Sequence, residues 1–440
     1  MLKLFANAWR VEDIRKKLLF IFLLLLIFRF GSAVPLPGLD LEVLDFARSP
    51  GNIDGGAMTF FALIVGGGVG SVFAMGIAPY ITASIIMQLL TYAIPQLSEL
   101  KKEGEEGNKK IQQITRYLAV ALAGLQAAAT VFSYTNFPAH VPDGFNMFRV
   151  GHQNFFVYLI ATISMMAGTI FIMWLAELIT EKGIGQGASF LIFANILAAL
   201  PAGAMTLWVM VTDGNTLSGI GQVVILLVVF AAIIAFVVMV HEGERRIPVQ
   251  YAKRAAGSGR GSSMHGNHNS FIPIKVNIAG VLSIIFAMSL LQFPMQIGMF
   301  FPNATGLSRV TNFLDWNNWT GAIIYVILIF MFTHFYTAFA VNPREMAENL
   351  KKNGGFIPGI RSGAPTSEFI QTTVNRLSWI GACFYALIAI TPIIMERIMP
   401  QLQGLGFGGT SLLIATGVAL EFAKQLESQL LMRHYKGFLD

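Results

Sequence analysis

Charged residues are scarce in this sequence. Only 12% of its 440 residues are Asp, Glu, Lys or Arg, whereas 55% are hydrophobic. Soluble domains carry roughly 25% charged residues, so this chain has too little charge to cover a surface in water. The scarcity excludes an ordinary soluble protein and indicates an integral membrane protein.

Reactive and metal-binding residues are also scarce. The single cysteine, Cys383, excludes an intrachain disulfide and a cysteine-based metal cluster. His265 and His268 lie three positions apart, but the sequence places no third ligand beside them. Phosphate-binding loops and nucleophile–base pairs are missing from the sequence as well. We therefore expect no cofactor, no metal site and no enzyme activity.

Titratable side chains are nearly missing from the middle of the apolar segments. An ion-coupled transporter keeps carboxylates, lysines or histidines there, because they bind the ion or relay the proton. Here Arg29, Glu177 and Glu421 lie near segment ends, and His334 alone lies near a centre. A packed contact between helices accounts for a lone histidine better than a proton relay does. Any transport through this chain would therefore draw its energy from a partner.

Long apolar runs are what the sequence has in abundance. They have the length of membrane-spanning helices, about 20 residues, and lack the alternation of β-barrel strands. Arg29 lies at the end of the first run, where a cleaved secretory signal is normally uncharged, so we interpret that run as a span. The runs predict ten spans, at residues 17–34, 71–92, 113–133, 153–176, 187–208, 219–241, 276–296, 320–341, 373–395 and 408–428.

Basic residues concentrate on alternate connections between these spans. Of the 30 Lys and Arg residues, 25 lie at the two termini or around the connections after spans two, four, six and eight. The positive-inside rule then places both termini in the cytoplasm. Ten spans divide into halves at 1–210 and 211–440, and five spans per half make the second half inverted. Segments 72–75 and 285–288, in the second span of each half, are similar but too short to establish a repeat.

Residues 57–65 form an apolar segment too short to cross a bilayer. A glycine-rich stretch, 66–70, separates it from the second span. Irregular backbone at membrane depth is tolerated inside protein or beside a water-filled cavity. The pattern fits a half-helix folded into a cavity, and it fits an outer loop with one apolar turn equally well.

Two connections on the predicted cytoplasmic side are long. The first, 242–275, starts with a basic run, and its middle, 255–270, is rich in Gly and Ser and should be mobile. The second, 342–372, contains a short helix that leads to a Gly/Pro-rich tip with an apolar pair, Phe356 and Ile357. Exposed apolar residues at a loop tip indicate a docking surface rather than a merely solvated basic loop. The candidate docking residues are Arg245, Arg246, Lys253, Arg254, Lys351, Lys352, Phe356, Ile357 and, above all, Arg361.

Several segments together resemble the SecY family of protein-conducting channels. They follow one another in the family's order, are specific in sequence and cover essentially the whole chain. The segments are 76–90 (GIAPYITASIIMQLL), 103–110 (EGEEGNKK), 179–187 (ITEKGIGQG), 342–345 (NPRE), 354–361 (GGFIPGIR) and 408–414 (GGTSLLI).

This resemblance implies an all-α membrane protein with ten transmembrane helices, in two pseudo-symmetric inverted halves around a central pore. The pore would open sideways, through a lateral gate between spans two and seven. A short plug helix would close it from outside, and segment 57–65 falls at the plug position. The plug residues implied are Met58, Phe60, Phe61, Leu63, Ile64 and Val65.

The resemblance also implies a constriction ring inside the pore. Branched alkyl side chains can dewet a narrow pore, which blocks ions and yields to a passing chain. Ala188 stands where the family usually has a bulky aliphatic residue, and 255–270 lacks the family's compact hairpin pattern. The ring residues implied are Ile81, Ile85, Ala188, Ile192, Ile285 and Ile414.

The implied function is a channel that passes unfolded secretory preproteins across the bacterial plasma membrane and inserts membrane proteins into it. Expected partners are SecE, SecG, the SecA ATPase, the ribosome, preproteins with their signal peptides, and membrane lipids. No nucleic-acid readout is expected beyond contact with ribosomal RNA. The alternative is a secondary transporter of a small solute, with a site formed by His334 and the glycine-broken second span, and a third class is a membrane scaffold. Uncharged span centres count against the transporter, and the half-helix counts against the scaffold.

Overall fold

The computed structural model describes residues 8–40, 70–135, 148, 154–213, 216–251, 270–300, 305–315, 318–398 and 409–436. Its helices are α2 (Glu12–Ala33), α5 (Ala78–Ala93), α6 (Pro95–Lys102), α7 (Glu105–Thr135), α8 (Phe155–Lys182), α9 (Gly187–Asp213), α10 (Thr216–Glu242), α11 (Leu282–Phe300), α12 (Thr305–Leu314), α13 (Trp319–Ala340), α14 (Pro343–Lys352), α15 (Ala364–Ile398) and α16 (Gly409–Lys436). Its strands are β1 (Glu244–Tyr251), β2 (Ser270–Lys275) and β3 (Gly355–Phe356).

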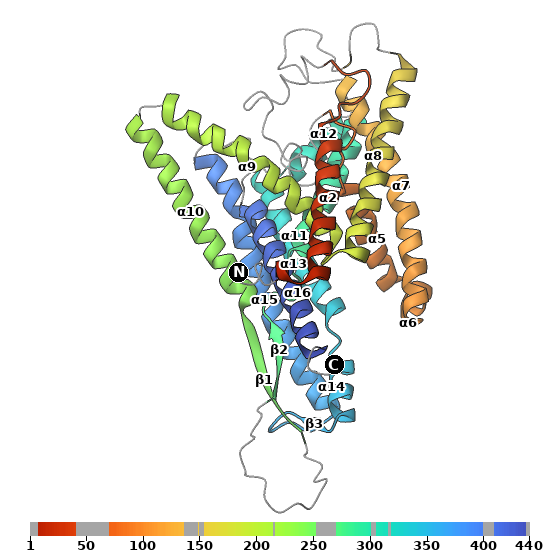
Figure 1. The fold of residues 1–440 in the computed structure, drawn as a ribbon, viewed down its shortest axis with the longest axis vertical. Helices are drawn as coiled ribbons and strands as arrows, with labels where there is room; N and C mark the ends of the chain where they lie inside the picture. The colour runs from red at the N-terminus through yellow and green to blue at the C-terminus, as the bar shows by residue number, and fades with distance from the viewer. Residues whose placement is uncertain are drawn as a thin grey trace, which may run out of the picture.

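The long helices run up and down a single bundle, so that successive connections alternate between its two ends (Figure 1). Each of the ten predicted spans overlaps one of them, namely α2, α5, α7, α8, α9, α10, α11, α13, α15 and α16. By length and apolar composition alone, five described helices can cross a membrane, or six when α5 and α6 count as one bent span. The protein is thus a multi-pass helical membrane protein, and the connections predicted to be cytoplasmic share the end that carries the strands. We call it the sheet end.

The second span begins later than the sequence predicts. Ser71 forms an isolated β-bridge with Pro35, residues 72–77 form turns rather than helix, and α5 begins only at Ala78. Pro79 stands in the first turn of α5, where a missing N–H costs nothing. At its other end α5 bends by 99° into α6, with Pro95 starting the new helix.

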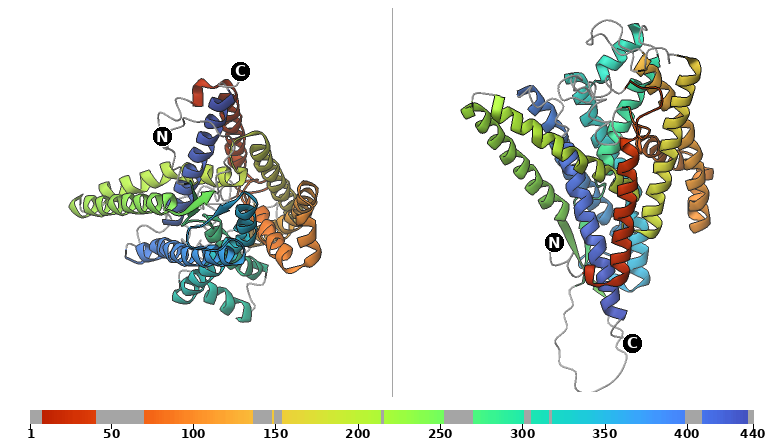
Figure 2. Two further views of the ribbon diagram at one scale, coloured as in Figure 1. Left: turned by 90° about the horizontal axis from the view of Figure 1, so that it is seen from below. Right: turned by 45° about the horizontal axis from the view of Figure 1, so that its top comes forward.

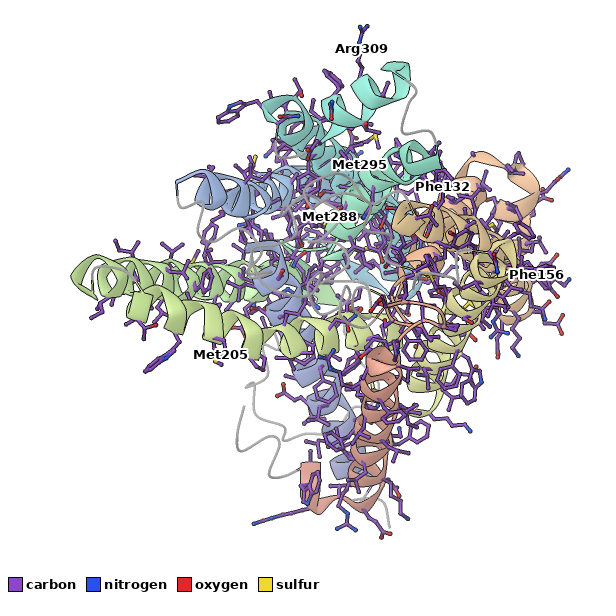
Figure 3. The ribbon with its side chains drawn as sticks, turned by 90° about the horizontal axis from the view of Figure 1, so that it is seen from above. Phe132, Phe156, Met205, Met288, Met295 and Arg309 are labelled. Carbon is purple, nitrogen blue, oxygen red and sulfur yellow. The ribbon has the colours of Figure 1, made fainter. Side chains whose placement is uncertain are left out.

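The outer surface of the bundle is apolar, as a surface that faces lipid requires. Phe156 and Met205 project away from the bundle and are 73% and 69% exposed, whereas Met288 lies in its middle and is buried (Figure 3). Because lipid tails are as apolar as these side chains, such exposure is tolerated in a membrane. Helices α9 and α10 form a hairpin that leans away from the other helices (Figures 1 and 2).

Helix α11 lies at the seam between the two predicted halves. It belongs to the second half, yet it packs on α5 and α7 of the first half as well as on α13. The largest cluster of buried apolar side chains follows this seam and takes residues from both halves, such as Phe28 of α2 and Phe286 of α11. This largest cluster therefore joins the two predicted halves, while smaller apolar clusters lie within one half each.

A three-stranded sheet at one end of the bundle was not predicted. Strands β1 and β2 pair antiparallel from Glu244↔Lys275 to Val249↔Ser270, and β3 pairs with the far end of β1. The two flanks of the connection 242–275 thus form a hairpin, whereas most of its Gly/Ser-rich middle, 255–270, lies outside the described residues. The reason for the hairpin is the alternation of Ile247 and Val249, which are buried while their neighbours in β1 are exposed.

Candidate functional site

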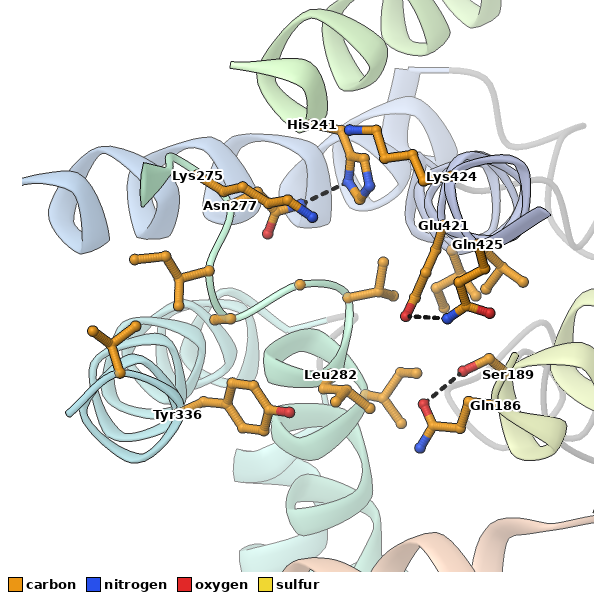
Figure 4. Close-up of a pocket in the computed structure, with 18 of the residues that line it drawn as sticks. Gln186, Ser189, His241, Lys275, Asn277, Leu282, Tyr336, Glu421, Lys424 and Gln425 are labelled. Carbon is orange, nitrogen blue, oxygen red and sulfur yellow. Dashed lines mark hydrogen bonds between the residues drawn. The ribbon is translucent and has the colours of Figure 1, made fainter. Parts of the chain in front are cut away.

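A cavity of about 660 Å³ opens among α9, α10, α11, α13 and α16 near the sheet end (Figure 4). Its wall changes character with depth. Along α16 the lining residues run from Ile414 and Val418 to Glu421 and Gln425, one helical turn apart and on one face. The polar residues lie toward the sheet end, so the cavity has a polar mouth and an apolar base.

The polar mouth holds hydrogen-bonding groups of mixed kind. Asn277 Nδ2 lies 2.9 Å from His241 Nδ1, and Ser189 Oγ donates to Gln186 Oε1 over 3.2 Å. No three His, Cys, Asp or Glu side chains gather to hold a metal ion within the described ranges. The mouth thus offers hydrogen bonds to many partners without the convergent geometry of a catalytic or metal site. Its polar lining residues are Gln186, Ser189, His241, Lys275, Asn277, Tyr336, Glu421, Lys424, Gln425 and Ser428.

The apolar base contains three of the six predicted ring residues, Ile192, Ile285 and Ile414. They come from α9, α11 and α16, so helices of both predicted halves meet there. Ile81 and Ile85 of α5 do not line the cavity, but they are buried in the same apolar cluster. The sixth residue, Ala188, is partly buried and packs against that extensive cluster. The cavity therefore groups Ile192, Ile285 and Ile414, and the ring of six stays a prediction.

The six predicted plug residues, Met58, Phe60, Phe61, Leu63, Ile64 and Val65, lie outside the described residues. The chain that follows them is firmly held at the end of the bundle opposite the sheet. Gly70 N–H donates to Tyr134 Oη over 3.2 Å, and Val72 N–H donates to the Val34 carbonyl over 3.0 Å. In addition, a Cβ on Gly168 of α8 would lie 2.3 Å from the Val72 carbonyl oxygen, so this position of α8 leaves no room for a side chain.

Most of the predicted docking residues lie together at the sheet end. Arg245 and Arg246 are exposed on β1, Lys351 and Lys352 are exposed at the end of α14, and Arg361 is exposed after β3. Lys253 and Arg254 lie outside the described residues.

Ile357 was wrongly predicted to be an exposed docking residue. It is only 3% exposed, within a cluster that includes Ile247 of β1 and Ile370 of α15, whereas Phe356 beside it is 38% exposed. Burial of Ile357 follows from pairing of β3 with β1, which turns alternate side chains toward α15. Ile357 thus fixes the loop, and Phe356 and Arg361 form its accessible surface.

The polar residues of the cavity mouth are not predicted from the sequence. Glu421 is expected only to lie near the end of a span, yet Glu421, Gln425 and Ser428 recur at helical spacing beyond Ile414. This spacing places the three polar residues on the same face of α16 as Ile414, and it could have indicated that they share one cavity. His334, the centre of the rival hypothesis, does not line this cavity; its Nδ1 lies 3.2 Å from the Phe330 carbonyl and its ring packs edge-on against Trp379 at 4.7 Å.

A multi-pass helical bundle whose cavity has a polar mouth and an aliphatic base has the architecture expected of a membrane channel. Comparison with known proteins gives the family. The SecY family model matches residues 71–423. The protein translocase subunit SecY of Streptomyces scabiei is 42% identical over 446 residues, which cover 100% of both chains. This chain belongs to the SecY family.

Solved structures share the fold. One described as "The structure of a protein conducting channel" matches with a TM-score of 0.65 and 18% identity over 93% of this chain and 90% of that one. Sec61 in the canine ribosome–channel complex matches with a TM-score of 0.62 and 18% identity, over 93% of this chain and 90% of its own.

Proposed function

We propose that this chain is the channel subunit of a protein translocase, through which unfolded preproteins cross the membrane and membrane proteins enter it. The observation that carries the proposal is the convergence of Ile192, Ile285 and Ile414 at the base of the cavity. Branched aliphatic side chains seal a pore against ions by excluding water, and they part for a chain of any sequence because they make no directional bonds. The polar mouth suits the same task, because it offers hydrogen bonds to a hydrated chain without selecting one.

Full-length similarity to translocase subunits supports this function. A relative that is 42% identical to this chain over the full length of both is described as a protein translocase subunit. We extend the assignment to the bacterial plasma membrane with both termini in the cytoplasm, because the sheet end carries most of the basic residues. The two halves, 1–210 and 211–440, would separate along the seam between α5 and α11.

The exposed basic groups of the sheet end, together with Phe356, form the proposed docking surface. Its basic residues are Arg245, Arg246, Lys351, Lys352 and Arg361. We propose that the SecA ATPase and the ribosome bind there, because the chain has no phosphate-binding loop of its own and a related channel is described in a ribosome complex. SecE and SecG would pack elsewhere on the bundle as partner subunits.

Crosslinking of a translocating chain tests this function. A photoreactive residue at the position of Ile414, or of Ile192, should crosslink to a secretory precursor that is stalled during translocation. The matched control is the position of Ile388 on α15, which is as buried as Ile414 but does not line the cavity. Equal yields at Ile414 and Ile388, or no adduct at Ile192 and Ile414 while the precursor crosses the membrane, would refute the proposed path.

A further inference from the structure

Two contacts bridge the seam between the halves near the sheet end, outside the ring and the docking surface. The ammonium of Lys101, on α6, lies 3.3 Å from the centroid of the Phe339 ring on α13. One turn earlier on α13, the ring of Phe335 meets that of Tyr92 edge-on, with centroids 5.7 Å apart and planes at 81°. Both contacts join the α5–α6 segment of the first half to α13 of the second half.

The local geometry makes these contacts specific. Because α6 turns away from α5 by 99°, it leaves the direction of the spans, and this turn carries Lys101 to α13. Phe335 and Phe339 are four residues apart and therefore share one face of α13. A lysine ammonium over an aromatic face is attracted by the negative potential of the ring.

Helix α13 is in turn tied to α11. Phe286 of α11 meets Phe332 and Tyr336 of α13 edge-on, at 6.0 and 6.1 Å between centroids. Helices α11 and α13 therefore move together more readily than either moves with α5. A displacement that parts α5 from α11 must break the contact between Lys101 and Phe339.

We propose that Lys101 and Phe339 form a latch that sets how apolar a segment of the passing chain must be to open the seam. The proposal rests on the proposed function and deepens it, because the latch acts on the sideways release of apolar segments. An apolar segment gains by leaving the channel for lipid, and that gain has to exceed the closing contacts. The contact between Lys101 and Phe339 adds a small fixed increment to the energy of closing, which the apolar segment has to exceed.

The expected size is modest and measurable. A cation–π contact at an exposed site shifts an equilibrium between closed and open states by about two- to fivefold. Lys101 is exposed and Phe339 is partly buried, so the range for exposed sites applies. Such a shift changes the transport of precursors whose signal segments are only weakly apolar, and it leaves the transport of precursors with strongly apolar signal segments unchanged.

The variants distinguish the effect of losing the cation–ring contact from the effect of losing one positive charge. Lys101→Gln and Phe339→Leu each remove the latch, and Lys101→Arg preserves it, because a guanidinium also binds an aromatic face. The matched control is Lys102→Gln, since Lys102 is the next residue of α6, is also exposed and has no ring or acidic partner in the described part of the chain.

Each full-length variant is reconstituted with its copurifying subunits and given precursors whose signal segments differ in leucine content. We expect Lys101→Gln and Phe339→Leu to lower the leucine content needed for half-maximal transport, with no further effect in the double variant. Spin labels at the exposed positions of Glu99 on α6 and Ala338 on α13, in a Cys383→Ser background, should show a separated population larger by about two- to fivefold. Lys101→Arg and Lys102→Gln should match the parent.

Three results would overturn the latch. One is an equal shift in Lys102→Gln, which would assign the effect to surface charge. Another is additive effects of the two single variants, and the third is an unchanged threshold and unchanged label distances in both. If the parent protein transports none of the precursors while its label distances still respond to Lys101→Gln, the proposed function fails, and only the closing contact between Lys101 and Phe339 stands.

Discussion

Replacement of Ile414 by asparagine distinguishes a pore residue from a core residue. Ile414 and Ile388 are each 1% exposed and belong to one apolar cluster, but only Ile414 lines the cavity. At Ile388 an asparagine would lose the burial of the apolar side chain, about 1.5–3 kcal/mol, and leave its amide unpaired, a further ~1–3 kcal/mol. At Ile414 the amide would reach water in the cavity, so only the apolar part is lost. Ile388→Asn should therefore be the less stable variant, by about 1–3 kcal/mol.

The two variants should differ in permeability in the opposite order. An amide at a dewetted constriction holds water, so Ile414→Asn should raise proton and ion conductance and admit precursors with defective signal sequences. Thermal unfolding, proton flux into proteoliposomes and transport of a defective-signal precursor would be measured on the same preparations. Lower stability of Ile414→Asn, without leak and without gain of transport, would remove Ile414 from the ring.

Three further predictions concern other parts of the molecule. Gly168→Val should displace the turn at Val72 and lower thermal stability by about 1–3 kcal/mol, whereas Gly124→Ala, whose Cβ would lie 3.4 Å from its nearest neighbour, should not; equal melting temperatures would contradict the close packing. Ile357→Ala should lower stability by about 2–5 kcal/mol, measured by thermal unfolding, because its side chain is buried. Arg361→Glu should change stability little but weaken stimulation of the motor ATPase, and full stimulation would show that Arg361 is not a docking residue.

Local sequence patterns predicted the bundle well, because a bilayer demands long apolar runs. The overlap of the long helices with the ten predicted spans follows from that demand alone. The start of α5 was misplaced, because apolar composition does not distinguish the turns at 72–77 from helix. The strands were not predicted, although Ile247 and Val249 lie two residues apart, as the apolar residues of a strand do. The charge of this connection indicates only a basic loop between spans.

The site depended on contacts that no local pattern contains. Each isoleucine of the ring, taken alone, is indistinguishable from ordinary core, and only the family resemblance grouped them. Burial of Ile357 requires β1, more than a hundred residues earlier in the chain, to be its neighbour. Lys101 was counted only as one of many basic residues, since nothing in the sequence around it indicates that it reaches Phe339.

The small sheet has a mechanical consequence. Strand β1 follows α10 after a single residue, Gly243, and β3 ties the loop carrying Arg361 to β1. A partner that binds this loop would therefore pull on one hydrogen-bonded sheet rather than on two separate connections. The sheet follows α10 through β1 and leads to α11 through β2. If the proposed docking surface is correct, a partner pulling on it would therefore turn the seam helix α11 without any charge moving inside the membrane.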